Sequence, residues 1–517
     1  MVKVRQPYPD KLPVRIPDNL DLNRLIAQSP PDFKCNVEFL KYIIHQIWER
    51  PIWDRKTASQ GSNPYVNLNA DILQKMNRKY NLHMKYLEHH HVIKINPSYR
   101  TGEHSMSYRL TQRYRHGIRV DEITDRKLIR KIEDSRRGYE LSAKQQYPYI
   151  VKWLDGIQID VKAATKYIKE WKKRNLSPRD GRPISEKRRE KIERKYHVYE
   201  YMIERIADKQ WPVKVDEKAG RLHTPLTNCL KALRKFISYR GEKITAVDLS
   251  CSQPYLSLLL FRKNFYMNKT VNNHQLLNVQ ELNKVNRENM EVRKDRVLKY
   301  LDEYISRTKT RRIHSNNYIT NTHTYQFIHP MPGKRRQPSD KEKVNGGVYL
   351  KFDTEDYGVF QREVEGGTLY EYMQNQLTDT TDGVNKPLDR NKVKRVVLTA
   401  MYASDAMTGD RHESYLYANK QRFKELFPSV YELFRIIKEE KHSTLALLLQ
   451  NVESIIFLKR VAKRIAKEHP TIPIITIHDS ICTTVGNEHF VEKIMMEEIE
   501  KATGVKPNLK VEAWASE

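Results

Sequence analysis

The spacing of apolar positions in residues 37–115 changes from a helical period to a strand period. Helices are indicated at Val37–Trp48, Asn69–Tyr80 and Leu82–His89, and strands at Val92–Asn96 and Ser107–Leu110. Helices followed by a two-stranded ribbon are typical of a winged helix, a helix-turn-helix variant. A helical cap with a hairpin packed on a larger body has the same order, so both interpretations stay open. The basic residues available for phosphate contacts are Lys75, Arg78, Lys79, Lys85, Arg100 and Arg109.

The segments on either side of this unit have different patterns. Residues 1–36 are rich in proline and predict an extended N-terminal arm. Residues 116–215 are mostly helical in pattern and heavily charged. Within them, Ser185–Tyr196 carries Glu and Lys or Arg at spacings of three and four, typical of a solvated helix with its own ion pairs. A helix that follows a nucleic-acid backbone has the same pattern, and the sequence does not separate the two.

Residues 216–517 combine strand-like apolar runs with helices, which predicts an α+β fold. One run, Ile244–Asp248, ends in a carboxylate. A second run, Ile472–Asp479, does the same and continues into Ser480–Val485, so a hairpin is expected with His478 and Asp479 at its turn. A further strand is indicated at Lys510–Ala513, and a basic loop at Met331–Gly347.

Two aspartates at the ends of neighbouring strands can share a metal site. Asp248 and Asp479 would then hold two hard cations about 4 Å apart, which activate a 3′-hydroxyl and stabilise leaving pyrophosphate. The carboxylates repel each other, so they stay charged and close only when such cations are bound. Aspartate at a strand end is also common in ordinary turns, and the two residues alone do not decide between these interpretations.

Residues 390–402 predict a helix with a cationic start. Arg390, Lys394, Leu398 and Tyr402 stand at successive spacings of four and share one face. Two cations suit the β- and γ-phosphates of a nucleoside triphosphate, and an aromatic ring two turns later suits its sugar or base. A basic amphipathic helix whose tyrosine packs in the core has the same spacing.

Charge and cysteine content narrow the choice of partner and compartment. The 517 residues carry a formal net charge of +29, which favours a polyanion such as nucleic acid, although basic surfaces also occur on ribosome-associated proteins. No apolar run has membrane-spanning length, so no membrane partner is expected. The four cysteines are far apart without a C-x-x-C pair, which argues against a zinc ribbon or a disulfide framework and fits a reducing cytoplasm.

Together these segments resemble the single-subunit polymerase superfamily, which comprises family A DNA polymerases and phage and mitochondrial RNA polymerases. Val247–Ser252 resembles motif A, Arg390–Tyr402 motif B, and Ile477–Ser480 motif C. The resemblance implies that Asp248, the Leu249 carbonyl and Asp479 bind metal. It makes Arg390 and Lys394 triphosphate ligands, with Lys394 also catalytic.

The same resemblance implies roles around the sugar and the nucleic acid. Tyr402 would lie beside the incoming sugar and His478 near the 3′ end of the growing strand. Gly220–Thr224 resembles a Gly-Arg-Leu segment, which makes Arg221 a minor-groove contact. Phe427–Val430 and Leu449–Ser454 resemble helices before motif C, which makes Gln450 a contact to template or primer.

Some positions depart from the family patterns. Gln253 stands where the DNA polymerases place Glu as a gate against the 2′-hydroxyl and the RNA polymerases place Gly, so the choice of sugar is open. Ala403 follows Tyr402 where Gly is usual. No exonuclease pattern of paired acids precedes Asp248, and the short stretch between motifs B and C leaves little room for a promoter-reading insertion.

The expected architecture is a right-hand palm, fingers and thumb core with an N-terminal winged-helix-like domain. The expected divisions are an arm at 1–36, a nucleic-acid-binding domain at 37–115 with Lys75, Arg78 and Arg109, a thumb-like region at 116–215, and palm and fingers at 216–517. Expected partners are a nucleic-acid template, its product strand and nucleoside triphosphates, with two Mg²⁺ ions, or Mn²⁺, as cofactors. Oligomeric state stays open. The resemblance hints at a bacterial or phage-infected cell or a mobile element.

Three functions remain open. Asp-x-Ser-Cys-Ser at Asp248 and His-Asp-Ser at His478 favour RNA synthesis by a compact RNA polymerase or primase-like polymerase. The Gly-Arg-Leu segment, Gln450 and the non-glycine Gln253 favour a minimal family A-like DNA polymerase. A non-enzymatic winged-helix DNA-binding replication protein is the third, and in that case Asp248 and Asp479 are ordinary turn residues.

Overall fold

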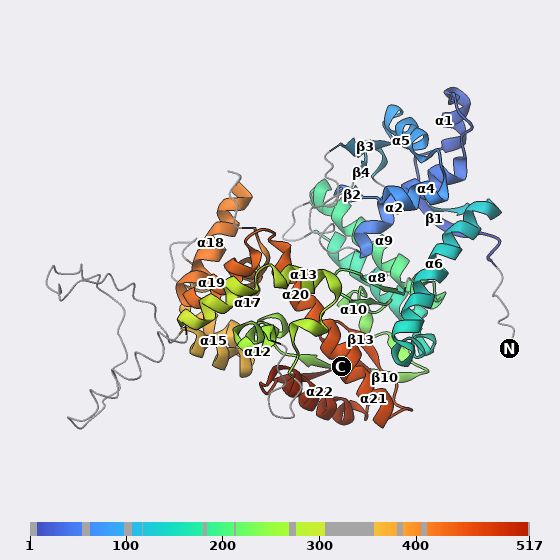
Figure 1. The fold of residues 1–517 in the computed structure, drawn as a ribbon. Helices are drawn as coiled ribbons and strands as arrows, with labels where there is room; N and C mark the ends of the chain where they lie inside the picture. Colours follow the sequence, from blue (N-terminus) through green and yellow to red (C-terminus); the bar gives the residue numbers. More distant parts are fainter. Residues whose placement is uncertain are drawn as a thin grey trace, which may run out of the picture.

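The chain forms two cores, which are visible in Figure 1 as a blue unit and a larger green-to-red body. The computed structural model describes residues 8–53, 63–97, 106–115, 117–178, 183–210, 213–267, 276–304, 356–379, 386–404 and 411–514. Buried residues from Leu12 to Ile132 form the core of the N-terminal unit, and those from Ala143 to Trp514 form the core of the body. Among the helices of this described part, none is long and apolar enough to cross a membrane.

The N-terminal unit contains the predicted helices and ribbon, but the helix predicted at Asn69–Tyr80 ends at Met76 and a third strand joins the ribbon. Its elements are β1 (Leu12–Pro17), α1 (Leu22–Gln28), α2 (Val37–Trp53), β2 (Val66–Asn67), α4 (Ala70–Met76), α5 (Tyr80–His89), β3 (Ile93–Asn96), β4 (Ser107–Leu110) and β5 (Ile118–Ile123). The strands β2, β4 and β3 form one antiparallel sheet in that order. Asn69 caps α4 by accepting the backbone N–H of Ile72, which fixes where that helix begins. Arg100, one of the predicted phosphate contacts, lies outside the described residues.

Residues 12–28, placed by the sequence in an extended arm, are part of this unit. Strand β1 pairs antiparallel with β5, from Leu12 opposite Ile123 to Pro17 opposite Ile118. Leu12, Val14 and Ile16 are buried in the N-terminal core. The alternating apolar positions of Leu12–Ile16 outweigh the prolines at either end, because proline is tolerated at the edge of a strand. The unit therefore begins before residue 37 and continues past residue 115.

A helical region connects the unit to the body. It contains α6 (Arg126–Gln146), α7 (Pro148–Val151), α8 (Val161–Leu176) and α9 (Glu186–Ala207). Helix α9 is not only solvated: Ile192 and Tyr196 are buried. Two of its carboxylates pair with other elements, Glu190 with Arg115 at 3.3 Å and Glu193 with Lys172 at 2.6 Å.

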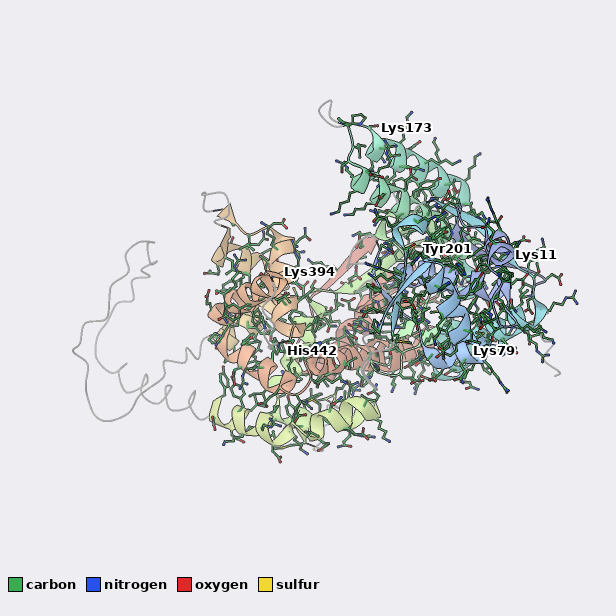
Figure 2. All side chains as sticks on the ribbon, turned by 90° about the horizontal axis from the view of Figure 1, so that it is seen from above. Lys11, Lys79, Lys173, Tyr201, Lys394 and His442 are labelled. Carbon is green, nitrogen blue, oxygen red and sulfur yellow. The ribbon has the colours of Figure 1, made fainter. Side chains whose placement is uncertain are left out.

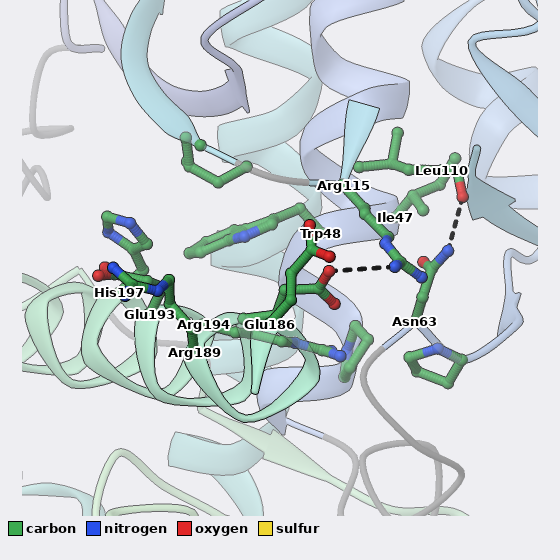
Figure 3. A pocket seen from close by; sticks show the side chains of 15 residues that line it. Ile47, Trp48, Asn63, Leu110, Arg115, Glu186, Arg189, Glu193, Arg194 and His197 are labelled. Atoms are coloured by element: carbon green, nitrogen blue, oxygen red, sulfur yellow. Dashed lines mark hydrogen bonds and ion pairs between the residues drawn. The ribbon is translucent and has the colours of Figure 1, made fainter. Parts of the chain in front are cut away.

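Helix α9 also contacts the N-terminal unit and so joins the two cores. Tyr201 donates to Glu49 of α2, and its ring packs edge-on against Trp48 at 5.3 Å between centroids. Arg15 of β1 forms an ion pair with Glu204. A cavity of about 260 Å³ lies at this junction. Figure 3 shows Trp48 on one side of it and the charged residues of α9 on the other.

A six-stranded antiparallel sheet organises the body. Its strands are β6 (Ile157–Ile159), β9 (Ile237–Tyr239), β10 (Glu242–Leu249), β13 (Ile475–Ile477), β14 (Ser480–Thr484) and β15 (Leu509–Ala513). Their order is β13-β14-β10-β9-β6, and β15 pairs with β10. Arg240 and Gly241 connect β9 to β10 and both have positive φ, which the tight two-residue hairpin requires. The strands predicted to begin at residues 244, 472, 480 and 510 are thus confirmed as parts of β10, β13, β14 and β15. Strand β13 is shorter than predicted, because it begins at Ile475.

Helices pack around this sheet, and others form a block beside it that shares the same core. Near the sheet lie β7 (Lys214–Val215), β8 (Leu222–His223), α10 (Lys231–Arg234), α11 (Ser252–Ser257), α12 (Lys263–Tyr266), α13 (Lys284–Glu291), α21 (Ala462–Glu468) and α22 (Glu488–Thr503). The block, seen at the left in Figure 1, contains α15 (Asp356–Glu365), α16 (Leu369–Gln376), β11 (Thr378–Asp379), β12 (Lys386–Pro387), α17 (Arg390–Tyr402), α18 (Arg411–Leu426), α19 (Pro428–Lys438) and α20 (Ser443–Ser454). The basic loop at Met331–Gly347 lies outside the described residues.

Candidate active site

The ends of two paired strands bring Asp248 and Asp479 into one place. Asp248 lies near the end of β10, opposite Ser480 at the start of β14. Asp479 occupies the turn between β13 and β14, and its backbone carbonyl accepts the N–H of Leu249 at 3.1 Å. The hairpin with His478 and Asp479 at its turn is therefore confirmed. The register of β10 against β14 places the two aspartates beside each other.

The electrostatics of this pair fit a cation. Burial raises the pKa of Asp248, and the negative charge of Asp479 raises it further, while a hydrogen bond from Ser480 lowers it. The ionised form of Asp248 is therefore disfavoured, and a bound cation would stabilise it. Carboxylate oxygens are the ligands that Mg²⁺ prefers. Within the described ranges no group of three or more His, Cys, Asp or Glu side chains is placed to hold a metal ion.

His478 occupies an unusual backbone conformation at the turn. Its φ of 55° lies in the left-handed region, which costs a side-chain-bearing residue about 1–2 kcal/mol. The paired strands on both sides hold it there, and such strain gathers at functional positions. The His478 ring lies edge-on to His223 of β8, with 6.3 Å between centroids.

Helix α17 begins and ends at the predicted residues and presents its cations to solvent. Asp389 caps it by accepting the N–H of Asn391. The Arg390 Nε donates to Glu371 of α16 at 2.8 Å, and the guanidinium lies 5.1 Å from the centre of the Tyr370 ring. Lys394, one turn later, is exposed.

Tyr370 connects the start of α17 to the aspartates. Burial raises the pKa of its hydroxyl, the positive charge of Arg390 lowers it, and the negative charge of Asp479 raises it. Both charges are thus close enough to act on one phenol. Tyr370 therefore lies near the charge of Arg390 and near that of Asp479.

A chain of hydrogen bonds runs from the end of α17 to β8. The Tyr402 hydroxyl donates to Gln253 Oε1 at 2.7 Å. Gln253 Nε2 donates to Glu453 Oε2 at 2.5 Å, and Arg221 donates to the same oxygen at 2.8 Å. The proposed sugar contacts Tyr402 and Gln253 are therefore joined to each other. Arg221, expected to contact the minor groove, is held by a carboxylate.

Glu453 is the member of this chain that the sequence interpretation missed. Its side chain is 2% exposed. Burial raises its pKa to about 7; Arg221 lowers that pKa, and the nearby charge of Asp479 raises it. A signal was present, because Glu453 is the one charged residue in the otherwise uncharged run Ser443–Leu458. A carboxylate in so apolar a helix is expected to have a specific partner.

The remaining predicted contacts lie further from this centre. Gln450 is half-buried on α20, one turn before Glu453 and Ser454. Lys75 and Arg78 are exposed around the end of α4, and Arg109 lies over the Tyr65 ring at 4.4 Å. Figure 2 shows Lys394 in the helical block and Lys79, the neighbour of Arg78, far from it in the N-terminal unit. The structure thus divides the predicted residues between two places.

Comparisons with known proteins add a distant likeness. No family model matches the chain, and no curated protein sequence is similar to it. Among solved structures, the chain is similar to the POL domain of Pol1 from M. smegmatis in complex with DNA primer-template and dNTP. That similarity covers 73% of this chain and 70% of that chain, with 11% sequence identity and a TM-score of 0.31.

Proposed function

We propose that this chain is a template-directed nucleotidyltransferase that synthesises RNA, as a compact RNA polymerase or a primase-like polymerase. The observation that carries the proposal is the meeting of Asp248 and Asp479 at the ends of paired strands. In this proposal the β10-centred sheet is the palm, α15–α20 form the fingers, and α6–α9 form a thumb-like region.

Asp248 and Asp479 would hold the catalytic cations, with the Leu249 carbonyl as a third ligand. Bound Mg²⁺ or Mn²⁺ would supply Lewis-acid activation of the 3′-hydroxyl and charge stabilisation of the leaving pyrophosphate. His478 lies in the same turn as Asp479, so its ring would orient the 3′ end of the growing strand.

Arg390 and Lys394 would bind the triphosphate. The Arg390 guanidinium is about half exposed and pairs with Glu371, so a more highly charged phosphate can replace that carboxylate at a modest cost. Lys394 adds a second cation one turn along the same face. Its ammonium would also stabilise charge on the leaving phosphates.

Tyr402 and Gln253 would meet the sugar, and their bonding leaves an acceptor that a ribose 2′-hydroxyl could use. Glu453 can only accept when ionised, so Gln253 turns its amide N–H toward it and its carbonyl toward Tyr402. An amide carbonyl has two acceptor sites, and the second one can accept a hydrogen bond from a ribose 2′-hydroxyl.

A DNA polymerase is the second candidate, and the size of Gln253 favours it. A side chain that is held from two sides, by Tyr402 and by Glu453, can also exclude a 2′-hydroxyl by its bulk. The same contacts therefore support two opposite preferences, and the sugar of the substrate separates them.

The N-terminal unit would bind the template. Its α4, α5, β3 and β4 follow the winged-helix order, and Lys75, Arg78 and Arg109 supply cations for phosphate contacts. In the body, Gln450 would contact the template or primer. Arg221 would reach the minor groove with the donors that Glu453 leaves available.

Primer extension on DNA and RNA templates, with ribonucleotides or deoxyribonucleotides and with Mg²⁺ or Mn²⁺, tests the proposal. Ribonucleotide incorporation that is lost in Asp479→Asn is the expected result. Preferential incorporation of deoxyribonucleotides would instead support the second candidate, a DNA polymerase. Retained DNA binding without any incorporation would favour a non-enzymatic winged-helix replication protein.

A further inference from the structure

A second cavity lies between the N-terminal unit and the body, near the candidate active site. Its volume is about 330 Å³. Strand β1 and helices α2 and α6 form one wall, and α9, β7 and β8 contribute to the other. His223 of β8 lines this cavity and also packs edge-on against His478, the neighbour of Asp479. The cavity therefore adjoins the turn that carries the candidate metal ligand.

The lining of this cavity has an excess of positive charge. Its cationic side chains are Arg50, Arg136, Arg205 and Lys214, and its carboxylate is Glu49. Burial lowers the pKa of His45 to about 4 and also lowers the pKa of His223, so neither ring adds charge near pH 7. Glu49 is already engaged, because it accepts hydrogen bonds from Tyr201 and from Gln46. Arg136 has its own partner in Glu133, at 2.7 Å.

Arg205 has a buried donor in this lining, although its guanidinium also lies 5.6 Å from the centre of the Tyr201 ring. Its side chain is buried, with 8% relative exposure. Its Nε is buried and donates to no acceptor in the part of the chain that the structure describes. Its Nη1 reaches Gln210 at 3.4 Å, which is long for a hydrogen bond. A buried donor without an acceptor costs about 1–3 kcal/mol, which an anion in the adjoining space would recover.

The rest of the lining indicates the size and kind of the anion. Apolar side chains, including Val14, Tyr42 and Ile132, cover the part of the cavity formed by the N-terminal unit. Arg50 and Arg136 come from the N-terminal side, whereas Arg205 and Lys214 come from the body. An ion with several charged oxygens can engage both sides at once, and phosphate is the group that arginine binds in this way.

We propose that this cavity is a phosphate-binding site, which takes the phosphate groups of a free nucleotide or the terminal phosphate of a nucleic-acid strand. The site is separate from the triphosphate contacts proposed for Arg390 and Lys394, and it does not require that the chain be a polymerase. Because its cations come from both units, a bound phosphate would hold the N-terminal unit against the body.

Calorimetric titration of the full chain with inorganic tripolyphosphate at 150 mM salt tests the site. The informative variant is Arg50→Ala combined with Lys214→Ala, and the matched control is Lys169→Ala combined with Lys394→Ala. Lys169 is an exposed lysine of α8 that lies outside the cavity. The Lys394→Ala substitution removes a cation of the other proposed phosphate site. Losing two charge-assisted contacts should weaken binding by at least about 100-fold, at roughly tenfold per contact. The control should retain the cavity's binding.

The source of the phosphate is distinguished by competition in the same titration. ATP that displaces tripolyphosphate indicates a nucleotide, and a 5′-phosphorylated oligonucleotide that does so better than its 5′-hydroxyl counterpart indicates a strand end. The proposal is overturned if tripolyphosphate shows no saturable binding, or if the cavity variant and the control lose affinity equally. Nucleotide incorporation is measured separately, so the loss of either conclusion leaves the other standing.

Discussion

Replacing Glu453 with Gln removes a buried charge and keeps the hydrogen bonds around it. Both Arg221 and Gln253 donate to the same oxygen, Oε2, whereas Oε1 is buried and has no partner among the described residues. A proton on Oε1 would therefore leave both accepted bonds in place. Glu453→Gln puts an amide nitrogen at that position, so it mimics the neutral acid.

The magnitude follows from the pKa of Glu453, which burial raises from its usual 4.5 to about 7. The folded protein holds this proton more tightly than the unfolded chain, so wild-type stability falls as the pH rises from about 4.5 to about 7. A displacement of roughly 2.5 pKa units corresponds to about 3 kcal/mol over the full range, and to somewhat less between pH 5 and pH 8. Glu453→Gln lacks this titration, so its stability relative to the wild type should rise by about 2–3 kcal/mol between those pH values.

Urea unfolding of both proteins at pH 5 and pH 8, with EDTA to remove cations, measures this change. Glu425→Gln, the same substitution at an exposed carboxylate of α18, serves as the matched control. A difference between Glu453→Gln and the wild type that is the same at both pH values would refute the reasoning. It would mean that Arg221 keeps Glu453 ionised throughout the range.

Other substitutions test the remaining assignments. Asp248→Asn or Asp479→Asn should abolish nucleotide incorporation while leaving DNA affinity nearly unchanged, and retained synthesis in either would remove the metal assignment. Lys394→Ala should raise the apparent KM for nucleotide roughly tenfold through loss of a charge-assisted contact, so an unchanged KM in steady-state kinetics counts against its triphosphate role. Lys75→Ala with Arg78→Ala should weaken template binding and reduce its salt dependence by about two phosphate contacts; an unchanged salt slope argues against template binding by this unit.

Much of the local structure could be predicted because it depends on local patterns. The helix at Arg390–Tyr402 has the predicted bounds, since Asp389 supplies a cap and four-residue spacing defines one face. The turn at His478 and Asp479 was predictable for the same reason, as two apolar runs with two polar residues between them form a tight hairpin.

The parts that could not be predicted depend on contacts between distant segments. The pairing of β1 with β5 joins residues about a hundred positions apart, and nothing in Leu12–Pro17 alone identifies its partner. The arrangement around Glu453 is similar. A lone acid in an apolar helix indicates a buried partner, but the sequence does not identify that partner, and only the packing selects Arg221 and Gln253.

Glu453 also holds the Arg221 guanidinium in one position, which affects how Arg221 could contact a nucleic acid. Because Oε2 accepts from Arg221 whether or not Oε1 carries a proton, titration of Glu453 changes the charge beside Arg221 without releasing its guanidinium. The Arg221 side chain is 20% exposed although its Nε is buried, so part of the guanidinium reaches solvent from a fixed position. A fixed arginine loses little conformational entropy when it binds a base edge or a sugar. The ion pair with Glu453 is therefore compatible with a minor-groove contact, and it joins that contact through one carboxylate to Gln253 and Tyr402, the residues proposed to meet the incoming sugar.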